Sequence, residues 1–436
     1  MATESSGVAD ALRISGFRSL LGSTIASSVG GSVSSVAVTW LVYHYTHSAV
    51  DVAYVGLAGI VPGLVLGLFA GVLADRYNRR RLMVTSDLVR MIVMAALAVA
   101  LYVAGFSLFL VLGAMSLVYS FSAIFTPASQ AILPRIVPVE RLESANGLLA
   151  ALSQTAYSVG AGVGGLTVVF LGAVAGIGVN AATFALSASF LLQIAVDAGR
   201  PKDRPLGSSG SFVKEFREGL SYIRNHLVIL EITLGFLPGN FLFTMTTNFL
   251  VVYAATVFGS DAAVYGYLSA GFAIGGAVGA LLVPRLRARR FAGVLLGVSV
   301  VLQGTCIAVL ALTRFFPIAL GAEIGLGVTL GLINTVYFST MQAIVPNEVL
   351  ARVLSIDMVG SFVAIPAGLL VGGFLAASRG VLFVYAISAV GLIVNGFGLL
   401  ALRDVRRLKY TGPGGPPVTE GNRADPDHPQ GGAQDG

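Results

Sequence analysis

The sequence predicts an all-α polytopic membrane protein with twelve transmembrane helices in two six-helix, pseudo-symmetric bundles. Two observations carry this prediction. Only 11% of the 436 residues are charged and 56% are hydrophobic, whereas a soluble domain carries about 25% charged residues. The chain also repeats itself across one long polar break, so that two halves of six apolar runs can be compared.

The apolar runs are long enough for membrane helices, because a bilayer core of about 30 Å requires roughly 20 helical residues. Pro62, Pro238 and Pro366 fall inside such runs, where proline kinks a membrane helix without ending it. The predicted spans are 17–43, 50–74, 82–104, 107–131, 145–171, 173–195, 227–257, 262–284, 291–312, 315–343, 352–377 and 380–402.

Two polar segments divide the chain into an N-terminal bundle at 11–195 and a C-terminal bundle at 227–404. Residues 196–226 form a cytoplasmic linker, and its second half predicts an amphipathic helix on the membrane surface. Four apolar residues share one face of that helix: Phe212, Phe216, Leu220 and Ile223. Residues 405–436 are rich in Gly and Pro and predict a disordered cytoplasmic tail.

Basic residues lie almost entirely in alternate loops and at the termini, and the opposite set of loops holds only Arg314 and Arg379. An excess of Lys and Arg marks cytoplasmic loops, so we expect a multi-pass protein of the cell membrane with both termini in the cytoplasm. Topology also explains the net charge of +6, so no nucleic-acid partner is expected.

The two halves match at an offset of 208 residues. The matching landmarks are Gly63, Gly67 and Gly71 with Gly271, Gly275 and Gly279; Pro138, Glu140 and Leu142 with Pro346, Glu348 and Leu350; and Gly160, Gly164 and Gly165 with Gly368, Gly372 and Gly373. A common offset predicts parallel halves related by an axis along the membrane normal. Glycines at four-residue spacing allow close helix packing. The same smooth faces would also let helices slide, and the two interpretations are compatible.

The loop GVLADRYNRR, residues 71–80, resembles the signature G-x-x-x-D-R-x-G-R-R of the major facilitator superfamily of secondary transporters. The usual second glycine is Asn78, which also accepts a left-handed turn. The resemblance covers about residues 11–404. It implies that Asp75 docks near the N-terminus of the eleventh span when the cytoplasmic side is closed. The implied conformational gate consists of Gly71, Asp75, Arg76, Arg79 and Arg80.

The stretch GAGVGGL resembles the G-P-x-x-G-G signature of the antiporter branches, with Ala161 in place of proline. Its matching glycines are Gly160, Gly164 and Gly165. The stretches TPASQAILPRIVP, NAATF and EGLSYI resemble the drug:proton antiporter subgroup that holds macrolide-efflux and siderophore-export proteins. Many of its members carry an arginine in the fourth span, but residues 107–131 hold no charge. If protons couple transport, other groups must therefore carry them.

Ionisable residues within spans are costly and point to function. Glu323 lies eight residues into the tenth span without a basic residue in helical reach, and burial favours the protonated form of a carboxyl group. We expect it to bind a proton or a cationic substrate; the alternative is a glutamate facing a wet vestibule. Asp87 and Arg90 can pair one turn apart, as a structural pair more than a relay. Glu231 and Asp357, near cytoplasmic helix starts, fit capping better than gating.

Uncharged polar residues of the spans could line a central cavity, although each could also bridge helices. The first candidates are Trp40, Asn180, Asn240, Asn334 and Tyr337, and further ones are Tyr157, Asn248, Gln303 and Asn395. Together with many Phe and Met residues they suit an amphiphilic cavity.

No catalytic residue, metal site or cofactor is expected. The spans contain no central His and neither H-E-x-x-H nor G-x-S-x-G, and the one cysteine, Cys306, excludes a Cys-based metal cluster. An intramembrane enzyme is therefore disfavoured. We expect a monomeric secondary exporter of a small amphiphilic compound, with proton antiport and alternating access. A specific siderophore or metabolite exporter, a lipid flippase of the same fold and a scaffold without transport stay open as alternatives.

Overall fold

The computed structural model describes residues 12–194, 217, 220–259, 262–283, 285–286 and 288–408. The first half contains α2 (Ser15–Thr46), α3 (Ala49–Arg76), α4 (Arg79–Ala104), α5 (Leu108–Ile136), η1 (Val139–Arg141), α6 (Leu142–Leu171) and α7 (Ala173–Leu192). The second half contains α9 (Leu227–Thr247), α10 (Leu250–Phe258), α11 (Ala262–Leu282), α12 (Ala288–Leu312), α13 (Phe316–Ile344), α14 (Asn347–Arg379), α15 (Val381–Ala401) and α16 (Arg403–Arg406).

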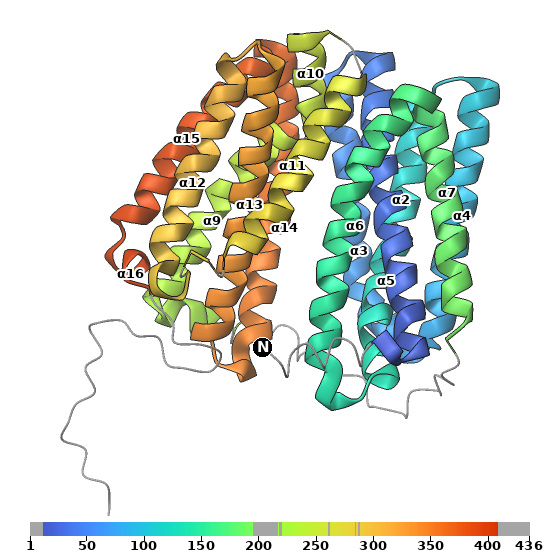
Figure 1. Cartoon of the computed structure of the whole chain (residues 1–436), viewed down its shortest axis with the longest axis horizontal. Helices are drawn as coiled ribbons and strands as arrows, with labels where there is room; N and C mark the ends of the chain where they lie inside the picture. The colour runs from blue at the N-terminus through green and yellow to red at the C-terminus, as the bar shows by residue number, and fades with distance from the viewer. Residues whose placement is uncertain are drawn as a thin grey trace, which may run out of the picture.

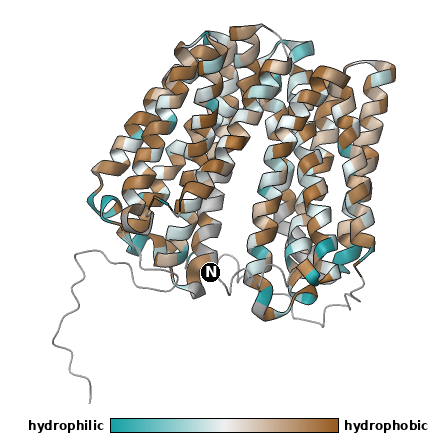
Figure 2. Cartoon of the chain, in the orientation of Figure 1, coloured by the Kyte–Doolittle hydropathy of each residue, from teal (hydrophilic) through white to brown (hydrophobic). Residues whose placement is uncertain are grey.

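The helices confirm the prediction of an all-α polytopic membrane protein. Ten described helices are long and apolar enough to cross a membrane, and α3 and α14 add the apolar segments Ala49–Gly63 and Val363–Arg379. Hydrophobic residues cover the helix lengths, and hydrophilic ones gather mainly toward the ends (Figure 2). Each predicted span corresponds to helix, and the helices continue through Pro62, Pro238 and Pro366. The part of the chain that is described contains no strand.

The helices form two bundles that stand side by side, α2–α7 and α9–α15 (Figure 1). Their internal packing is equivalent. In the first bundle α2 packs on α6 and α7, α3 on α5, and α4 on α5 and α7. In the second, α9 packs on α14 and α15, α11 on α13, and α12 on α13 and α15. The sequence repeat is therefore a structural repeat.

The glycines that match across the repeat also make matching contacts. A Cβ built on Gly160 would lie 2.7 Å from the carbonyl oxygen of Val29 in α2. Its repeat partner Gly368 stands in the same relation to Phe241 in α9, at 2.6 Å. Real Cβ atoms essentially never approach another atom this closely, so in each half a glycine allows the fifth span to touch the first.

The last glycine of each motif faces the other bundle. A Cβ on Gly165 would lie 2.2 Å from the Cα of Gly266 in α11, and a Cβ on Gly373 would lie 2.9 Å from the Cβ of Ala53 in α3. These two contacts join α6 to α11 and α14 to α3 near the bundle end opposite the start of α2. The ribbons diverge toward the end where α2 begins (Figure 1). The bundles are therefore held together mainly at one end.

The glycines at four-residue spacing pack differently in the two halves. The first set is Gly63, Gly67 and Gly71, and the second set is Gly271, Gly275 and Gly279. Gly275 and Gly279 pack against the backbone of α13, where a Cβ would approach the carbonyl oxygens of Ile324 and Val328 within 2.0 and 2.1 Å. Gly63 has open space around it. The side chains around Gly67 and Gly71 lie outside the described part of the structure. Close helix packing therefore explains the glycines of the second half but does not explain Gly63.

The predicted span 227–257 is wrong in one respect, because it is broken. α9 ends at Thr247 and α10 begins at Leu250. The backbone carbonyl of Thr246 accepts hydrogen bonds from the N–H of Phe249 (3.0 Å) and from the hydroxyl of Tyr385 (3.2 Å). Neither Pro nor Gly marks this break. Its sequence signal is the run Thr246-Thr247-Asn248, since such side chains compete with helical backbone hydrogen bonds.

The two segments predicted as linker and tail pack partly on the second bundle. Residues 220–225 are helical, and Ile223 is buried in the hydrophobic core of that bundle. Phe212 and Phe216 lie outside the described residues. Val405 and Leu408 are buried in the same core, so the chain stays folded beyond residue 404, where the sequence predicts the tail to begin.

A buried ion pair links the helices of the first bundle. The Arg90 guanidinium pairs with the Asp87 carboxylate, and both side chains are almost fully buried. The other carboxylate oxygen of Asp87 accepts from the Ser187 hydroxyl of α7 at 2.5 Å, and Arg90 donates to the Ser122 hydroxyl of α5 at 3.1 Å. Ser23 in α2 lies 2.7 Å from Ser187. The network therefore joins four helices.

Two aromatic rings complete the surroundings of Arg90. The guanidinium carbon lies 4.7 Å from the ring centre of Phe125 and 4.5 Å from that of Phe184. Such cation–π contacts favour a desolvated arginine. This packing supports a structural role for the pair.

Removing one member of the pair should destabilise the protein strongly. In the variant Arg90→Met the Asp87 carboxylate keeps its burial but loses its charge partner, which costs about 3–5 kcal/mol in buried pairs. The double variant Asp87→Leu/Arg90→Met leaves no buried charge and should lose less stability than either single variant. Thermal unfolding of the detergent-solubilised protein measures both. A single variant as stable as the parent would contradict the structural role.

Candidate functional site

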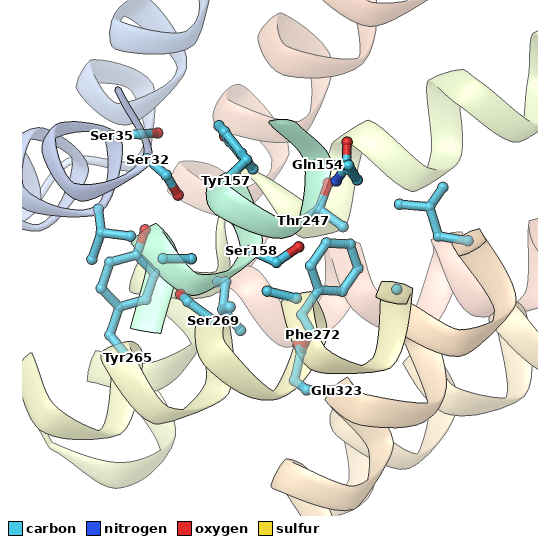
Figure 3. A pocket seen from close by; sticks show the side chains of 16 residues that line it. Ser32, Ser35, Gln154, Tyr157, Ser158, Thr247, Tyr265, Ser269, Phe272 and Glu323 are labelled. Carbon is cyan, nitrogen blue, oxygen red and sulfur yellow. The ribbon is translucent and has the colours of Figure 1, made fainter. Parts of the chain in front are cut away.

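A cavity of about 190 Å³ lies between the two bundles. The first bundle contributes Ser32 and Ser35 from α2 and Tyr157 from α6, and the second contributes Tyr265 from α11 and Glu323 from α13 (Figure 3). Further labelled lining residues are Gln154, Ser158, Thr247, Ser269 and Phe272. Both halves of the repeat therefore build one cavity with polar and apolar lining residues, as the binding site of a transporter requires.

Among the described residues, Glu323 is the one acidic or basic side chain in the wall of this cavity. Its side chain belongs to a residue that is only 3% exposed. Among the described residues, no hydrogen bond or ion pair engages its carboxylate. The nearest basic residue along the chain, Arg314, is exposed and donates to the carbonyl of Thr313. A charge held here without a counter-ion is costly, so a proton or a bound cation would neutralise it favourably.

Two buried tyrosines lie near Glu323. Tyr253 and Tyr385 are close enough to interact electrostatically with its carboxylate. Their rings stack with centroids 5.0 Å apart and an interplanar angle of 14°. Tyr253 is fully buried, and its hydroxyl has no hydrogen-bond partner in the described part of the structure. Neither tyrosine lines the cavity, so the two rings add buried surroundings to Glu323 without supplying a counter-ion.

Hydroxyl groups line the cavity around Glu323. Tyr157 lies beside Ser35 of α2, and Tyr265 lies beside Thr39 of α2 and Ser269 of its own helix. The Tyr265–Thr39 neighbourhood bridges the two bundles. These groups can donate and accept hydrogen bonds without adding charge, so the cavity offers one acid among neutral polar partners.

A second cavity of about 220 Å³ adjoins the first. Its polar lining includes Ser35, Thr39, Tyr119, Tyr157 and Asn248. Its apolar walls include Val38, Val52, Val55, Ile60 and Met115. In the part of the chain that the structure describes, no carboxylate, lysine, arginine or histidine lines it. Its chemistry is therefore neutral and amphiphilic.

The residues first predicted to line a cavity lie elsewhere in the structure. Asn180 is 1% exposed and donates to the Ser34 hydroxyl at 2.9 Å, so it bridges α7 and α2 inside the first bundle. Tyr337 is buried against the Phe236 ring, and Asn334 is exposed. Trp40 stacks on His44 with centroids 4.4 Å apart. Like Asn240, these residues line neither cavity.

Sequence reasoning found only part of the lining. Glu323, Tyr157 and Asn248 are lining residues, but Asn395 bridges α15 to the Gly235 carbonyl of α9 instead. The serines of α2 and the pair Tyr119 and Tyr265 were missed. The serine-rich run SSVGGSVSS in the first span carries a signal, because so many hydroxyls in a membrane helix require polar surroundings.

The predicted gate is described only in part. Gly71, Asp75 and Arg76 lie in α3, but their side chains fall outside the described part of the structure, as does that of Asp357. Arg79 donates to the carbonyl of Ala131 in α5 at 3.0 Å. Arg80 donates to the carbonyls of Leu191 (3.1 Å) and Leu192 at the end of α7. Cations suit the negative end of a helix dipole, so these arginines fix the start of α4 against its neighbours.

Glu231, which the sequence predicts to cap its helix, lies outside the first turn. It is the fifth residue of α9, whose first turn holds no acid. It lies beside Asp404 and Val405 of α16. It therefore contacts the C-terminal segment instead of capping its own helix. No group of three metal-ligating side chains occurs among the residues described.

Comparisons with known proteins agree with this geometry. The model of the family described as transmembrane secretion effector, a major facilitator group, matches residues 6–409. The multidrug efflux pump Tap of Mycolicibacterium fortuitum is 25% identical over 89% of this chain and 96% of its own length. Macrolide efflux protein A of Streptococcus pyogenes is 23% identical over 88% of this chain and 94% of its own length.

Solved structures share the fold. The nucleoside transporter NupG superposes with a TM-score of 0.69 at 13% identity, covering 88% of this chain and 98% of its own. A bacterial homologue of the iron transporter ferroportin, in an inward-facing state, superposes with a TM-score of 0.67 at 16% identity, covering 89% and 98%. At such identities these structures establish the fold alone. The family match spans nearly the whole chain, and the chain therefore belongs to the transmembrane secretion effector family of the major facilitator superfamily.

Proposed function

We propose that this protein exports small amphiphilic cations in exchange for protons. One observation carries the proposal: Glu323, a buried carboxyl without a basic partner among the described residues, lies in the wall of a cavity that both bundles build. The relatives named above as multidrug and macrolide efflux pumps support export of drug-like compounds. The absence of any other acid or base from the cavity wall supports a positively charged substrate.

A single carboxylate supplies a simple coupling rule. It can be neutralised by a proton or by a cation, but one negative charge does not stabilise both at once. Binding of one therefore releases the other, and alternating access turns this competition into exchange across the membrane. The coupling needs no second titratable group in the cavity, which agrees with the lack of charge in residues 107–131.

The arrangement of the bundles supports an inward-facing state. The close contacts at Gly165 and Gly373 lie near the end opposite the start of α2, and the helices diverge toward the other end. The loops at that other end hold most of the Lys and Arg residues, which favours a cytoplasmic position for them and for both termini. We infer a monomer of the cell membrane that closes by rocking one bundle against the other.

The gate at residues 71–80 is a second part of this proposal. Arg79 and Arg80 hold the start of α4, and this leaves Asp75 as the residue for docking on the N-terminus of α14 when the cytoplasmic side closes. A carboxylate at a helix N-terminus is stabilised by the dipole. Docking of Asp75 would thus favour the state in which the cytoplasmic side is closed.

Replacement of the acid tests the coupling. The variant Glu323→Gln keeps the shape of the side chain but cannot exchange a proton, so pH-gradient-driven efflux should fall to background while the protein stays folded. The conservative variant Glu323→Asp keeps the carboxyl and should retain part of the activity. Efflux of ethidium from proteoliposomes under imposed pH gradients measures both. If Glu323→Gln follows the parent at every gradient, Glu323 is not the carrier.

A methyl group at the bundle contact tests alternating access. In Gly165→Ala the new Cβ would collide with Gly266, so the inward-facing state should lose population. A cysteine at Gln154, in a Cys306→Ser background, should then react more slowly with a membrane-impermeant maleimide applied from the cytoplasmic side. The matched control Gly178→Ala adds its methyl to open space and should react like the parent. Equal rates in both variants would contradict the contact as a determinant of the state.

Loss of the gate carboxylate should have the opposite effect. Asp75→Asn removes the charge that would dock on α14, so the cytoplasmic side should open more often and the Gln154 reporter should react faster. The control Asp51→Asn alters an acid at the other end of the same helix. An unchanged labelling rate in Asp75→Asn would count against the latch.

A further inference from the structure

The two cavities are neighbours. They share Ser35 and Tyr157 in their walls. Their volumes are about 190 and 220 Å³, and drug-sized ligands occupy pockets of about 300–1,000 Å³. Neither cavity alone reaches this range, and only the two together fall within it.

The internal repeat relates the two cavities. Met115 precedes Glu323 by the same 208 residues that separate the other matched pairs. Met115 lines the second cavity from α5, and Glu323 lines the first from α13. The two helices are repeat equivalents. At equivalent places one half of the protein therefore carries an acid and the other a soft apolar side chain.

The break in the seventh span lies where the cavities meet. Thr247 lines the first cavity and Asn248 the second, and the two are adjacent at the end of α9. Interrupted helices bring polar backbone and side-chain groups to binding sites at the centre of transporters. This break lies at the junction of the two cavities on the side of the second bundle. Tyr157 and Ser35 lie at the same junction on the side of the first bundle.

We propose that the two cavities form a two-part ligand site with divided chemistry. The basic nitrogen of a ligand binds at Glu323, and a neutral ring bearing hydroxyl, ether or carbonyl oxygens binds between Tyr119, Thr39 and Met115. Tyr157 and Asn248 contact the part of the ligand that connects its basic nitrogen to its neutral ring. The substrate class is thus a monocationic amphiphile with a bulky, oxygen-bearing neutral part. This inference rests on the proposed export function and adds the second subsite to it.

The glycine at position 59 allows a test that leaves Glu323 untouched. A Cβ on Gly59 would lie 3.2 Å from the Tyr119 ring, so Gly59→Val narrows the neutral cavity. The matched control is Gly113→Val in α5, where the added atoms meet open space on an exposed face. Tyr119→Phe removes only a hydroxyl and serves as a second variant should Gly59→Val fold poorly.

Two probes distinguish the subsites in proteoliposomes. Ethidium is a compact planar cation, and erythromycin joins one basic amine to a large neutral ring rich in oxygen. Gly59→Val should lower erythromycin transport by about tenfold or more, as misfit side chains do in tight pockets, and should leave ethidium within about twofold. Tyr119→Phe should lower erythromycin transport by about three- to tenfold, the value of one hydrogen bond. Gly113→Val should match the parent for both probes.

The outcomes separate the two proposals. If Gly59→Val and Tyr119→Phe lower both probes equally, or neither probe, the two-part site is overturned while export stands. A parent that moves ethidium but not erythromycin also overturns it. Another outcome is that the parent protein transports erythromycin alone. In that case the two-part site is supported if Gly59→Val and Tyr119→Phe reduce erythromycin transport and Gly113→Val does not. Any other pattern of the three variants overturns it. A parent that moves neither probe contradicts the export proposal itself.

Discussion

The backbone contact between Gly165 and Gly266 is the constraint on which the rest of the structure depends. Without Cβ atoms the two helices meet at a separation that no other residue pair allows, and Gly373 makes the repeat-related contact on the other side of the interface. Together they hold two bundles at one end. The space between the bundles toward the other end, with its cavities, exists because this contact acts like a hinge between the two bundles.

The repeat explains how such a hinge arises, and departures from the repeat explain the chemistry. In both halves the first, fifth and sixth spans pack alike, and the fifth span uses two glycines for its own bundle and the last glycine of the motif for the other. Two of the differences lie at the cavities. Glu323 has Met115 as its counterpart, and the interrupted seventh span corresponds to a first span, α2, that is continuous. Symmetry therefore supplies the framework, and local asymmetry supplies the binding site.

The sequence was sufficient to predict the helical spans apart from the break in the seventh, to predict the repeat, and to identify Glu323 as a buried acid, because each depends on properties of single segments. Apolar length identifies a span, a fixed offset identifies a repeat, and a lone acid in an apolar run is conspicuous. It could not predict which polar residues face the cavity. Asn180 and Tyr157 look alike in sequence as polar residues in apolar helices, but Asn180 faces Ser34 in a neighbouring helix and Tyr157 faces the space between bundles. That distinction depends on the rotation of each helix within the fold.

The break at Asn248 was missed for a related reason. No proline or glycine signals it, and its hydrogen bonds depend on Tyr385, which lies far along the chain. The burial of Val405 and Leu408 was missed because the polar residues around them predict a tail. In both cases a contact between distant segments outweighs the local preference of the chain.

The glycine contact has a consequence for how the protein responds to its surroundings. It consists of uncharged backbone atoms, and van der Waals contact is insensitive to dissolved ions. The proposed latch at the opposite end depends on a carboxylate near a helix terminus and on a loop rich in arginine, and attraction between exposed charges is screened by salt. The two ends of the molecule are thus closed by different forces. Ionic strength acts on one of them alone, so under the proposed gating a higher ionic strength on the side of the latch would favour the state in which the latch is open.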